Sequence, residues 1–203
     1  MMYLSLVIVL LATFTLPAPV THATPITFTA DLLGANEVPP SGSPGRGNAT
    51  VVLDSLANTL HVDVTFSGLL AGTTASHIHC CLPSPGATGI NVGVATTVPT
   101  FPGFPLGVTA GTYSRDFSLL DPATYNPAFV TGQGGTIAGA KAALVAGIEN
   151  TETYLNVHTT LFPNGEIRGF LTAAPEPGTG LLLTCGLVIL GIDAWRRQRS
   201  RIA

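Results

Sequence analysis

Residues 154–171, Tyr-Leu-Asn-Val-His-Thr-Thr-Leu-Phe-Pro-Asn-Gly-Glu-Ile-Arg-Gly-Phe-Leu, decide the fold because they alternate as a β-hairpin does. The turn is predicted at Pro163-Asn164-Gly165, since Asn and Gly tolerate positive φ and Pro fixes its own φ. Alternation places His158 on the polar face of the first strand, and Glu166 and Arg168 on the polar face of the second. With the register that this turn predicts, these polar side chains meet.

The rest of the chain has the composition of an all-β protein. Gly (23) and Pro (16) are abundant and only 9% of residues are charged. Turns between short β-branched runs favour strands over helices. Apolar residues at helical spacing predict one helix, at 136–148. About seven short strands and this helix predict a β-sandwich with Greek-key connections. The strands outside the hairpin are expected at 24–33, 49–53, 60–66, 76–80 and 112–119.

The charge of the chain excludes nucleic acid as a partner. Residues 24–174 contain nine acidic side chains and four basic ones, which leaves a net charge of about −5. The basic residues are scattered, so this region lacks the electrostatic footprint of a nucleic-acid-binding protein. Its length of about 150 residues suits one domain with a single core.

The N-terminus has the pattern of a secretory signal peptide. An apolar run at 1–16 is followed by small residues at 17–23, and Thr21-His22-Ala23 has small residues at its first and last positions. We therefore expect residues 1–23 to form a signal helix that is removed on export. An uncleaved membrane anchor is the alternative interpretation of the same apolar run.

The C-terminus resembles the PEP-CTERM protein-sorting signal of Gram-negative bacteria. A Pro-Glu-Pro motif is followed by an apolar segment at 179–192, which predicts a transmembrane helix, and then by an arginine cluster. The cluster places the C-terminus in the cytoplasm and the preceding domain outside, with the membrane crossed at least transiently. The residues that carry the signal are Pro175, Glu176, Pro177, Arg196, Arg197, Arg199 and Arg201.

The resemblance to this sorting signal implies a route of export and a location. Segments of this family are handled by a membrane protease called exosortase, and the proteins that carry them are exported in species that make exopolysaccharide. Residues 175–203 are then a sorting segment with transient inner-membrane anchoring. The mature protein is expected at the cell surface, in the outer membrane or outside the cell, with exopolysaccharide or other surface proteins as partners. A permanent single-pass anchor remains the alternative.

The region between the two ends resembles the CHRD domain, named for the extracellular growth-factor antagonist chordin. The resemblance runs from 28 to 171 and rests on three spaced motifs in order, the last of which has two parts. They are Leu33-Gly-Ala-Asn-Glu-Val-Pro-Pro40, Ala75-Ser-His-Ile-His79, Tyr154-Leu-Asn-Val-His-Thr159 and Gly165-Glu-Ile-Arg-Gly169. It implies an immunoglobulin-like β-sandwich at 24–174, an extracellular setting and no established catalytic activity. A third possible function, antagonism of protein ligands as in chordin, rests on this analogy alone.

Two histidines spaced two apart are the strongest chemical signal. His77 and His79 project from the same face of a strand, which suits metal binding because imidazole is a ligand for Zn and Cu. His158 could complete a site with three nitrogens, with Glu166 as a further ligand or as a partner of a ligand. The sequence therefore predicts a candidate Cu or Zn site on these four residues.

A purely structural role explains the same residues. In that interpretation His77 and His158 form a hydrogen bond across the strands, and Glu166 pairs with Arg168 or Arg115. Polar clusters in exported β-domains often serve only to satisfy buried polar groups.

Adjacent cysteines form the last unusual motif. In an oxidising compartment Cys80 and Cys81 are expected to form a vicinal disulfide. Soft-metal ligation beside His79 is the alternative, and either arrangement offers a redox switch. Cys185 lies in the predicted sorting segment.

Enzyme motifs do not stand out. The chain has no Gly-x-Ser-x-Gly elbow, phosphate loop or dinucleotide fingerprint. The leading hypothesis is an exported binding or structural protein of the cell surface or extracellular matrix, sorted by exosortase. The rival hypothesis is an exported metalloprotein built on the histidines, for which redox activity is one of the roles open to it.

Overall fold

The computed structural model describes residues 24–175 of the chain. The predicted signal peptide and almost all of the predicted sorting segment lie outside the described residues. Between 24 and 175, no helix is both long enough and apolar enough to span a bilayer.

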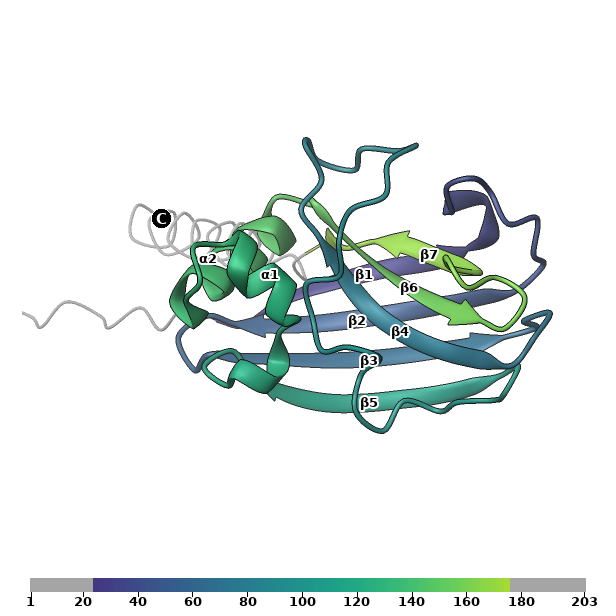
Figure 1. Ribbon diagram of the computed structural model, residues 1–203, viewed down its shortest axis with the longest axis horizontal. Coiled ribbons are helices and arrows are strands. Elements are labelled where there is room, and N and C mark those ends of the chain that lie inside the picture. The colour runs from purple at the N-terminus through teal and green to yellow at the C-terminus, as the bar shows by residue number, and fades with distance from the viewer. Residues whose placement is uncertain (1–23, 176–203) are drawn as a thin grey trace, which may run out of the picture.

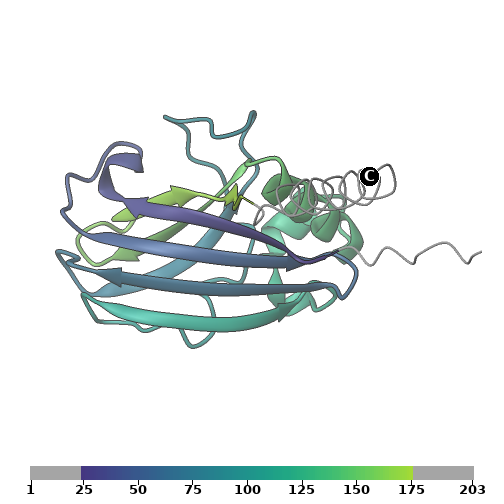
Figure 2. The same ribbon diagram turned by 180° about the vertical axis from the view of Figure 1, so that it is seen from behind.

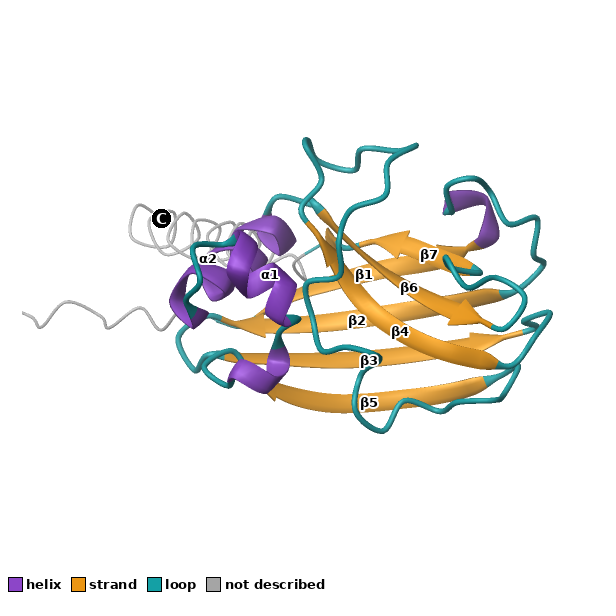
Figure 3. Cartoon of the chain, in the orientation of Figure 1, coloured by secondary structure: helices purple, strands orange, loops and turns teal. Residues whose placement is uncertain are grey.

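The described residues form eight strands in one antiparallel sheet (Figures 1 and 3). The sheet order is β4-β6-β7-β1-β2-β3-β5, and β8 pairs with β1. β4 and β6 lie across β1 and β2 in Figure 1, while the view from behind shows β1, β2, β3 and β5 as one broad layer (Figure 2). The sheet thus curls into a half-barrel. The strands are β1 (Ile26–Leu33), β2 (Arg46–Asp54), β3 (Thr59–Ser67), β4 (Thr73–Cys80), β5 (Gly111–Ser118), β6 (Thr153–Thr159), β7 (Ile167–Phe170) and β8 (Thr172–Ala173).

The prediction of an immunoglobulin-like, two-sheet sandwich is therefore corrected to one curled sheet. β7 pairs with β6 on one side and meets β1 on the other, at Leu33 opposite Arg168. This short contact joins β4 and β6 to the broad layer as one continuous sheet. A strand with one buried face alternates in the same way in a sandwich and in a half-barrel, so alternation could not separate the two.

The predicted alternation of buried and exposed residues along the strands is confirmed. Along β3, Leu60, Val62, Val64 and Phe66 are buried, and the residues between them are partly or fully exposed. Asn58, with a φ of 59°, lies in the turn between β2 and β3. Buried residues from the concave sides of the strands form a single hydrophobic core.

Two α-helices close one end of the half-barrel (Figures 1 and 3). α2 (Ile137–Glu149) is the predicted helix, and its buried Leu144 and Ile148 join the core. α1 (Pro127–Gly132) was not predicted, because six residues are too few to show a helical period. Two 3₁₀ turns complete the fold, η1 (Gly34–Asn36) and η2 (Pro122–Thr124).

Candidate metal centre

The β6–β7 hairpin forms as the sequence predicts, with a longer loop. The amide of Gly165 donates to the carbonyl oxygen of Phe162 at 3.0 Å, which closes a turn around Pro163 and Asn164. The register sets Asn156 opposite Arg168, so Arg168 lies on the face of β6 that also carries His158.

Pairing of β4 with β6 brings the three predicted histidines together. His77 lies opposite Asn156 and His79 opposite Tyr154, so both histidines share the face of His158. All three are buried, with 5–8% of each residue exposed. One candidate ligand atom of each ring lies within 4.8 Å of the other two. This spacing is suitable for three ligands of one metal ion, so the group could hold one.

Each ring is oriented by a backbone carbonyl from a neighbouring loop. Two of these carbonyls belong to the 81–110 connection between β4 and β5, and the third belongs to the β6–β7 loop. The contacts are His77 Nε2 to Pro99 O (2.5 Å), His79 Nδ1 to Val92 O (2.7 Å) and His158 Nδ1 to Pro163 O (2.9 Å). A carbonyl oxygen only accepts, so these nitrogens carry the hydrogen of a neutral ring.

The remaining nitrogens are therefore lone-pair acceptors. Nδ1 of His77 lies 3.3 Å from Nε2 of His158. The distance between these two nitrogens permits the hydrogen bond that was expected across the strands. That bond, however, requires one of the two rings to bind a second proton. Nε2 of His79 is buried and has no hydrogen-bond partner among the described residues. Converging lone pairs of this kind are the arrangement that a metal ion satisfies.

Burial keeps the rings neutral at neutral pH. Removal from water lowers the pKa of His77 and of His79 to about 4, although the carbonyl contacts act in the opposite direction. Burial also lowers the pKa of His158. Neutral imidazole is the form that binds metals, so the environment favours the ligand state.

The comparison with protein families agrees with the CHRD motifs in the sequence. The model of the CHRD domain family matches residues 28–171. This chain belongs to the CHRD family. The match includes all three histidines of the candidate centre and every strand from β2 to β7. Neither the comparison with curated proteins nor the comparison with solved structures gives a significant match.

A stack of rings supports one side of the centre in this CHRD domain. The ring of Tyr154 is nearly parallel to that of His79, with centroids 4.7 Å apart and planes at 11°. The guanidinium of Arg168 lies 4.5 Å from the centroid of Tyr154. Sequence reasoning did not assign Tyr154 a role, because an aromatic residue in a strand is most often part of a core.

Arg168 is fully buried behind this stack. Nε donates to the carbonyl oxygen of Asn36 and lies 3.7 Å from a carboxylate oxygen of Glu37. Nη1 donates to Oδ1 of Asn91 at 2.9 Å. Arg168 therefore ties the η1 loop and the 81–110 connection to β7, which helps to cover the histidines.

Glu166 does not join the histidine group of the CHRD domain. Its carboxylate accepts from the hydroxyls of Thr159 and Ser43 and from the amide of Leu70, each at 2.6 Å. None of the ion pairs within residues 24–175 includes Glu166, so the expected pairing with Arg168 or Arg115 is not found. Its contact with Thr159 places it on the opposite side of the hairpin from His158.

Cys80 and Cys81 are joined by a disulfide at the end of β4. Cys80 follows His79, so its side chain lies on the other face of the strand, in the hydrophobic core. Both sulfurs lie near the carbonyl oxygen of Ala143 in α2, at 3.7–3.8 Å. The sulfurs therefore take no part in the histidine group.

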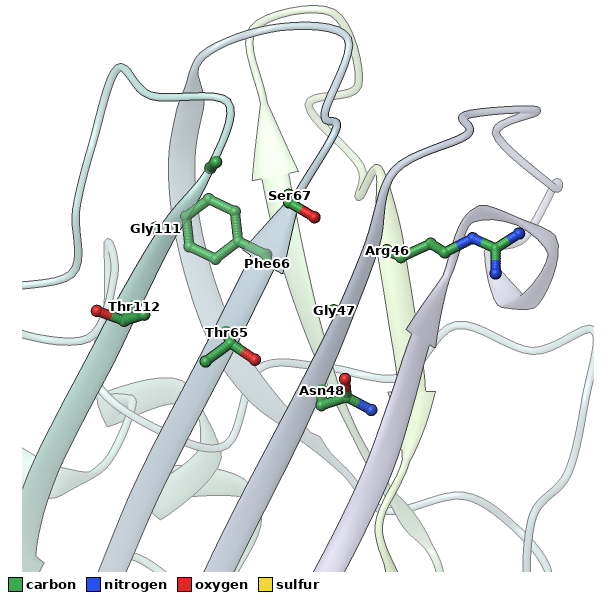
Figure 4. Close-up of a pocket in the computed structure, with 9 residues that line it drawn as sticks. Arg46, Gly47, Asn48, Thr65, Phe66, Ser67, Gly111 and Thr112 are labelled. Carbon is green, nitrogen blue, oxygen red and sulfur yellow. The ribbon is translucent and has the colours of Figure 1, made fainter.

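A hollow lies at one end of β2, β3 and β5, and none of the three histidines lines it (Figure 4). It is a shallow region of about 530 Å³. Its side chains are an arginine, an amide, hydroxyls and an aromatic ring, with no histidine, cysteine or carboxylate among the lining residues. The hollow therefore offers no metal or acid–base chemistry.

Proposed function

We propose that this chain is an exported CHRD protein that holds a copper or zinc ion with His77, His79 and His158. The observation that carries the proposal is the orientation of the rings. Each imidazole donates to a carbonyl with one nitrogen and presents the other toward its neighbours. In established metal sites, a ligating histidine is commonly oriented by such a contact.

Three imidazoles leave room for a further ligand. Zinc is usually tetrahedral, and copper also accepts imidazole ligands, so both metals suit this donor set. With three protein ligands, one position is left for water or for a small molecule, as in catalytic rather than structural zinc sites. A bound copper ion would add redox chemistry, and a bound zinc ion would act as a Lewis acid.

Export to the cell surface or the extracellular matrix is the second part of the proposal. It is supported by the signal-peptide pattern of residues 1–23 and by the sorting pattern of residues 175–203. The disulfide between Cys80 and Cys81 is also suited to an oxidising compartment. We infer that exosortase processes the chain, and that exopolysaccharide or other surface proteins surround the mature form.

Metal content tests the first part of the proposal. The exported protein is purified without an affinity tag, and its metals are measured by plasma mass spectrometry. We expect near-stoichiometric copper or zinc, and its loss in His77→Ala. His61→Ala is the matched control, because His61 on β3 contacts Asp63 of the same strand and Asp116 of β5 and lies outside the group. Absence of metal even after reconstitution would leave an exported binding or structural module.

Cell fractionation tests the second part. In a host with exosortase, the unaltered chain is expected outside the cytoplasm and without its C-terminal segment. A triple substitution of Pro175, Glu176 and Pro177 by Ala is expected to leave the uncleaved chain in the inner membrane. Retention of the unaltered chain in the cytoplasm would refute export.

A further inference from the structure

Asn156 lies in the middle of the face that carries the three histidines. It is directly opposite His77 in the β4–β6 pair and precedes His158 by two residues on β6. His79 follows His77 by two residues on β4, which makes it the diagonal neighbour of Asn156. Asn156 is itself only 1% exposed. Its side chain is therefore a neighbour of all three rings of the candidate metal centre.

The side-chain oxygen of Asn156 is a buried acceptor without a donor. Oδ1 has no hydrogen-bond partner within residues 24–175, and neither has Nε2 of His79. The amide of Asn156 lies beside the ring of His79. Because Nδ1 of His79 donates to Val92, Nε2 of the neutral ring offers a lone pair, as Oδ1 does. Two neighbouring side chains thus present unsatisfied acceptors, and a metal ion satisfies both.

Glu37 determines which end of this amide faces the histidines. A Cβ at Gly165 would lie 2.8 Å from Nδ2 of Asn156 and 2.4 Å from Oε1 of Glu37, so the amide nitrogen and the carboxyl group are close together. An amide nitrogen only donates and a carboxylate only accepts, which favours this orientation. With Nδ2 beside Glu37, Oδ1 is the amide atom that is left to face His79.

We propose that Oδ1 of Asn156 is the fourth ligand of the metal ion, an assignment that rests on the proposed centre of three histidines. Zinc with three imidazoles needs a fourth ligand to complete its tetrahedron. Amide oxygens are known in this role, since a Gln oxygen is the weak axial ligand of some copper sites. Asn156 then fills the position that an external ligand would otherwise take. Glu37 orients the amide as the carbonyls orient the rings.

A ligand from the protein suits the burial of the centre. The three histidines are 5–8% exposed, so solvent has little access to them. The main chain of Asn156 is held in place, because its carbonyl oxygen accepts from the hydroxyl of Ser76 at 2.8 Å. An amide oxygen is a weaker ligand than an imidazole nitrogen. Removal of the Asn156 side chain should therefore leave the metal on the histidines and open the fourth position.

The test uses Co²⁺ as a spectroscopic substitute for zinc and azide as the external ligand. The exported protein is freed of metal with a chelator, loaded with Co²⁺ and titrated with azide, while visible absorption reports the coordination of the ion. We expect azide to bind Asn156→Ala at least about tenfold more tightly than the unaltered protein, a difference of about 1.4 kcal/mol. Asn156→Asp keeps an oxygen at this position and should still exclude azide. Asn48→Ala is the matched control, because the Asn48 amide lies on β2 and donates to Asp31.

A second measurement needs no variant, so it stands even if Asn156→Ala does not fold. Zn²⁺ added to the metal-free, ¹⁵N-labelled protein should shift the side-chain amide resonances of Asn156 and leave those of Asn48 in place. Unmoved Asn156 resonances in the zinc-loaded protein would overturn the assignment, as would equal azide affinity of the unaltered protein and Asn156→Ala. Both results require bound metal, so they would leave the histidine centre intact. Failure of the unaltered protein to bind Co²⁺ or Zn²⁺ would refute the centre and the fourth ligand together.

Discussion

Nδ1 of His77 and Nε2 of His158 face each other at 3.3 Å, and in the neutral rings neither atom carries a hydrogen. Each ring already donates to a carbonyl from its other nitrogen, so the tautomers are fixed by the loops. Two lone pairs at this distance repel each other unless a cation or a proton lies between them. Because the pKa of His77 is lowered to about 4, a proton is not available at neutral pH. This pair is therefore the main reason to expect a metal.

Zinc is expected to stabilise the folded protein. An ion that binds only the folded state, at a hundredfold excess over its dissociation constant, raises the free energy of unfolding by about 2.7 kcal/mol. Thermal unfolding of chelator-treated protein, with and without Zn²⁺, measures this change. His158→Ala should abolish the zinc-dependent rise in Tm, and His61→Ala should retain it. An equal rise in His158→Ala would place the zinc elsewhere.

Tyr154→Leu is expected to weaken metal binding about 10- to 100-fold, the usual effect of removing a group that orients a ligand. The reason is loss of the ring that stacks on His79 and contacts Arg168. Tyr154→Phe keeps the ring and loses only the hydroxyl contact to Val92, so its affinity should stay close to that of the unaltered protein. Competition with a chromogenic chelator measures both. Equal losses of metal affinity in the two variants would mean that the hydroxyl of Tyr154, and not its ring, supports metal binding.

Gly147→Ala is expected to destabilise the domain by about 1–3 kcal/mol through overpacking. A Cβ at this position of α2 would lie 2.6 Å from Sγ of Cys80 and 3.2 Å from Sγ of Cys81. Gly132→Ala in α1 is the control, since a Cβ there meets nothing within 4 Å. Urea unfolding compares the two variants. A similar free energy of unfolding for the two variants would mean that α2 can move away from the disulfide.

Glu37 should make stability fall as pH rises. Its pKa is about 7 in the folded protein against 4.5 for an unperturbed carboxyl, so the folded state binds the proton more tightly. The stabilisation is complete below about pH 4.5 and is lost as pH rises through 7, by up to about 3 kcal/mol. The difference in unfolding free energy between the unaltered protein and Glu37→Gln should decrease over this range. If this difference in unfolding free energy did not change with pH, the raised pKa of Glu37 would be contradicted.

Glu166→Gln separates a structural role from a ligand role. The carboxylate accepts hydrogen bonds from Thr159, Ser43 and Leu70. An amide has only one acceptor oxygen, so we expect a loss of about 1–3 kcal/mol in unfolding free energy. Metal content should be unchanged, because Glu166 lies outside the histidine group. A lower metal content in a folded variant would restore Glu166 as a ligand.

Regular alternation made part of this site predictable. Two histidines at positions i and i+2 share a face in any strand, and the hairpin pattern placed His158 on a neighbouring polar face. Glu166 was misplaced because the loop between β6 and β7 is longer than the tight turn that the motif suggests. β7 begins at Ile167, so Glu166 still belongs to the loop and does not follow the alternation of the strand, whereas Arg168 does.

The parts that could not be predicted belong to irregular segments. The orienting carbonyls of Val92, Pro99 and Pro163 are main-chain atoms, which carry no signature in residue type. Glu37 is a single acidic residue in a turn-rich stretch, and such a residue is usually solvated. Its burial depends on the contact with Arg168, which is distant in sequence.

The use of main-chain oxygens to aim the three rings has an evolutionary consequence. A carbonyl remains in place when the side chain of its own residue is exchanged, so point substitutions in the surrounding loops leave the alignment of the imidazoles intact. Insertions and deletions move the backbone itself. Among related chains we therefore expect the ligand geometry to diverge with the lengths of the 81–110 and 160–166 segments, and to tolerate wide drift in their amino-acid identity.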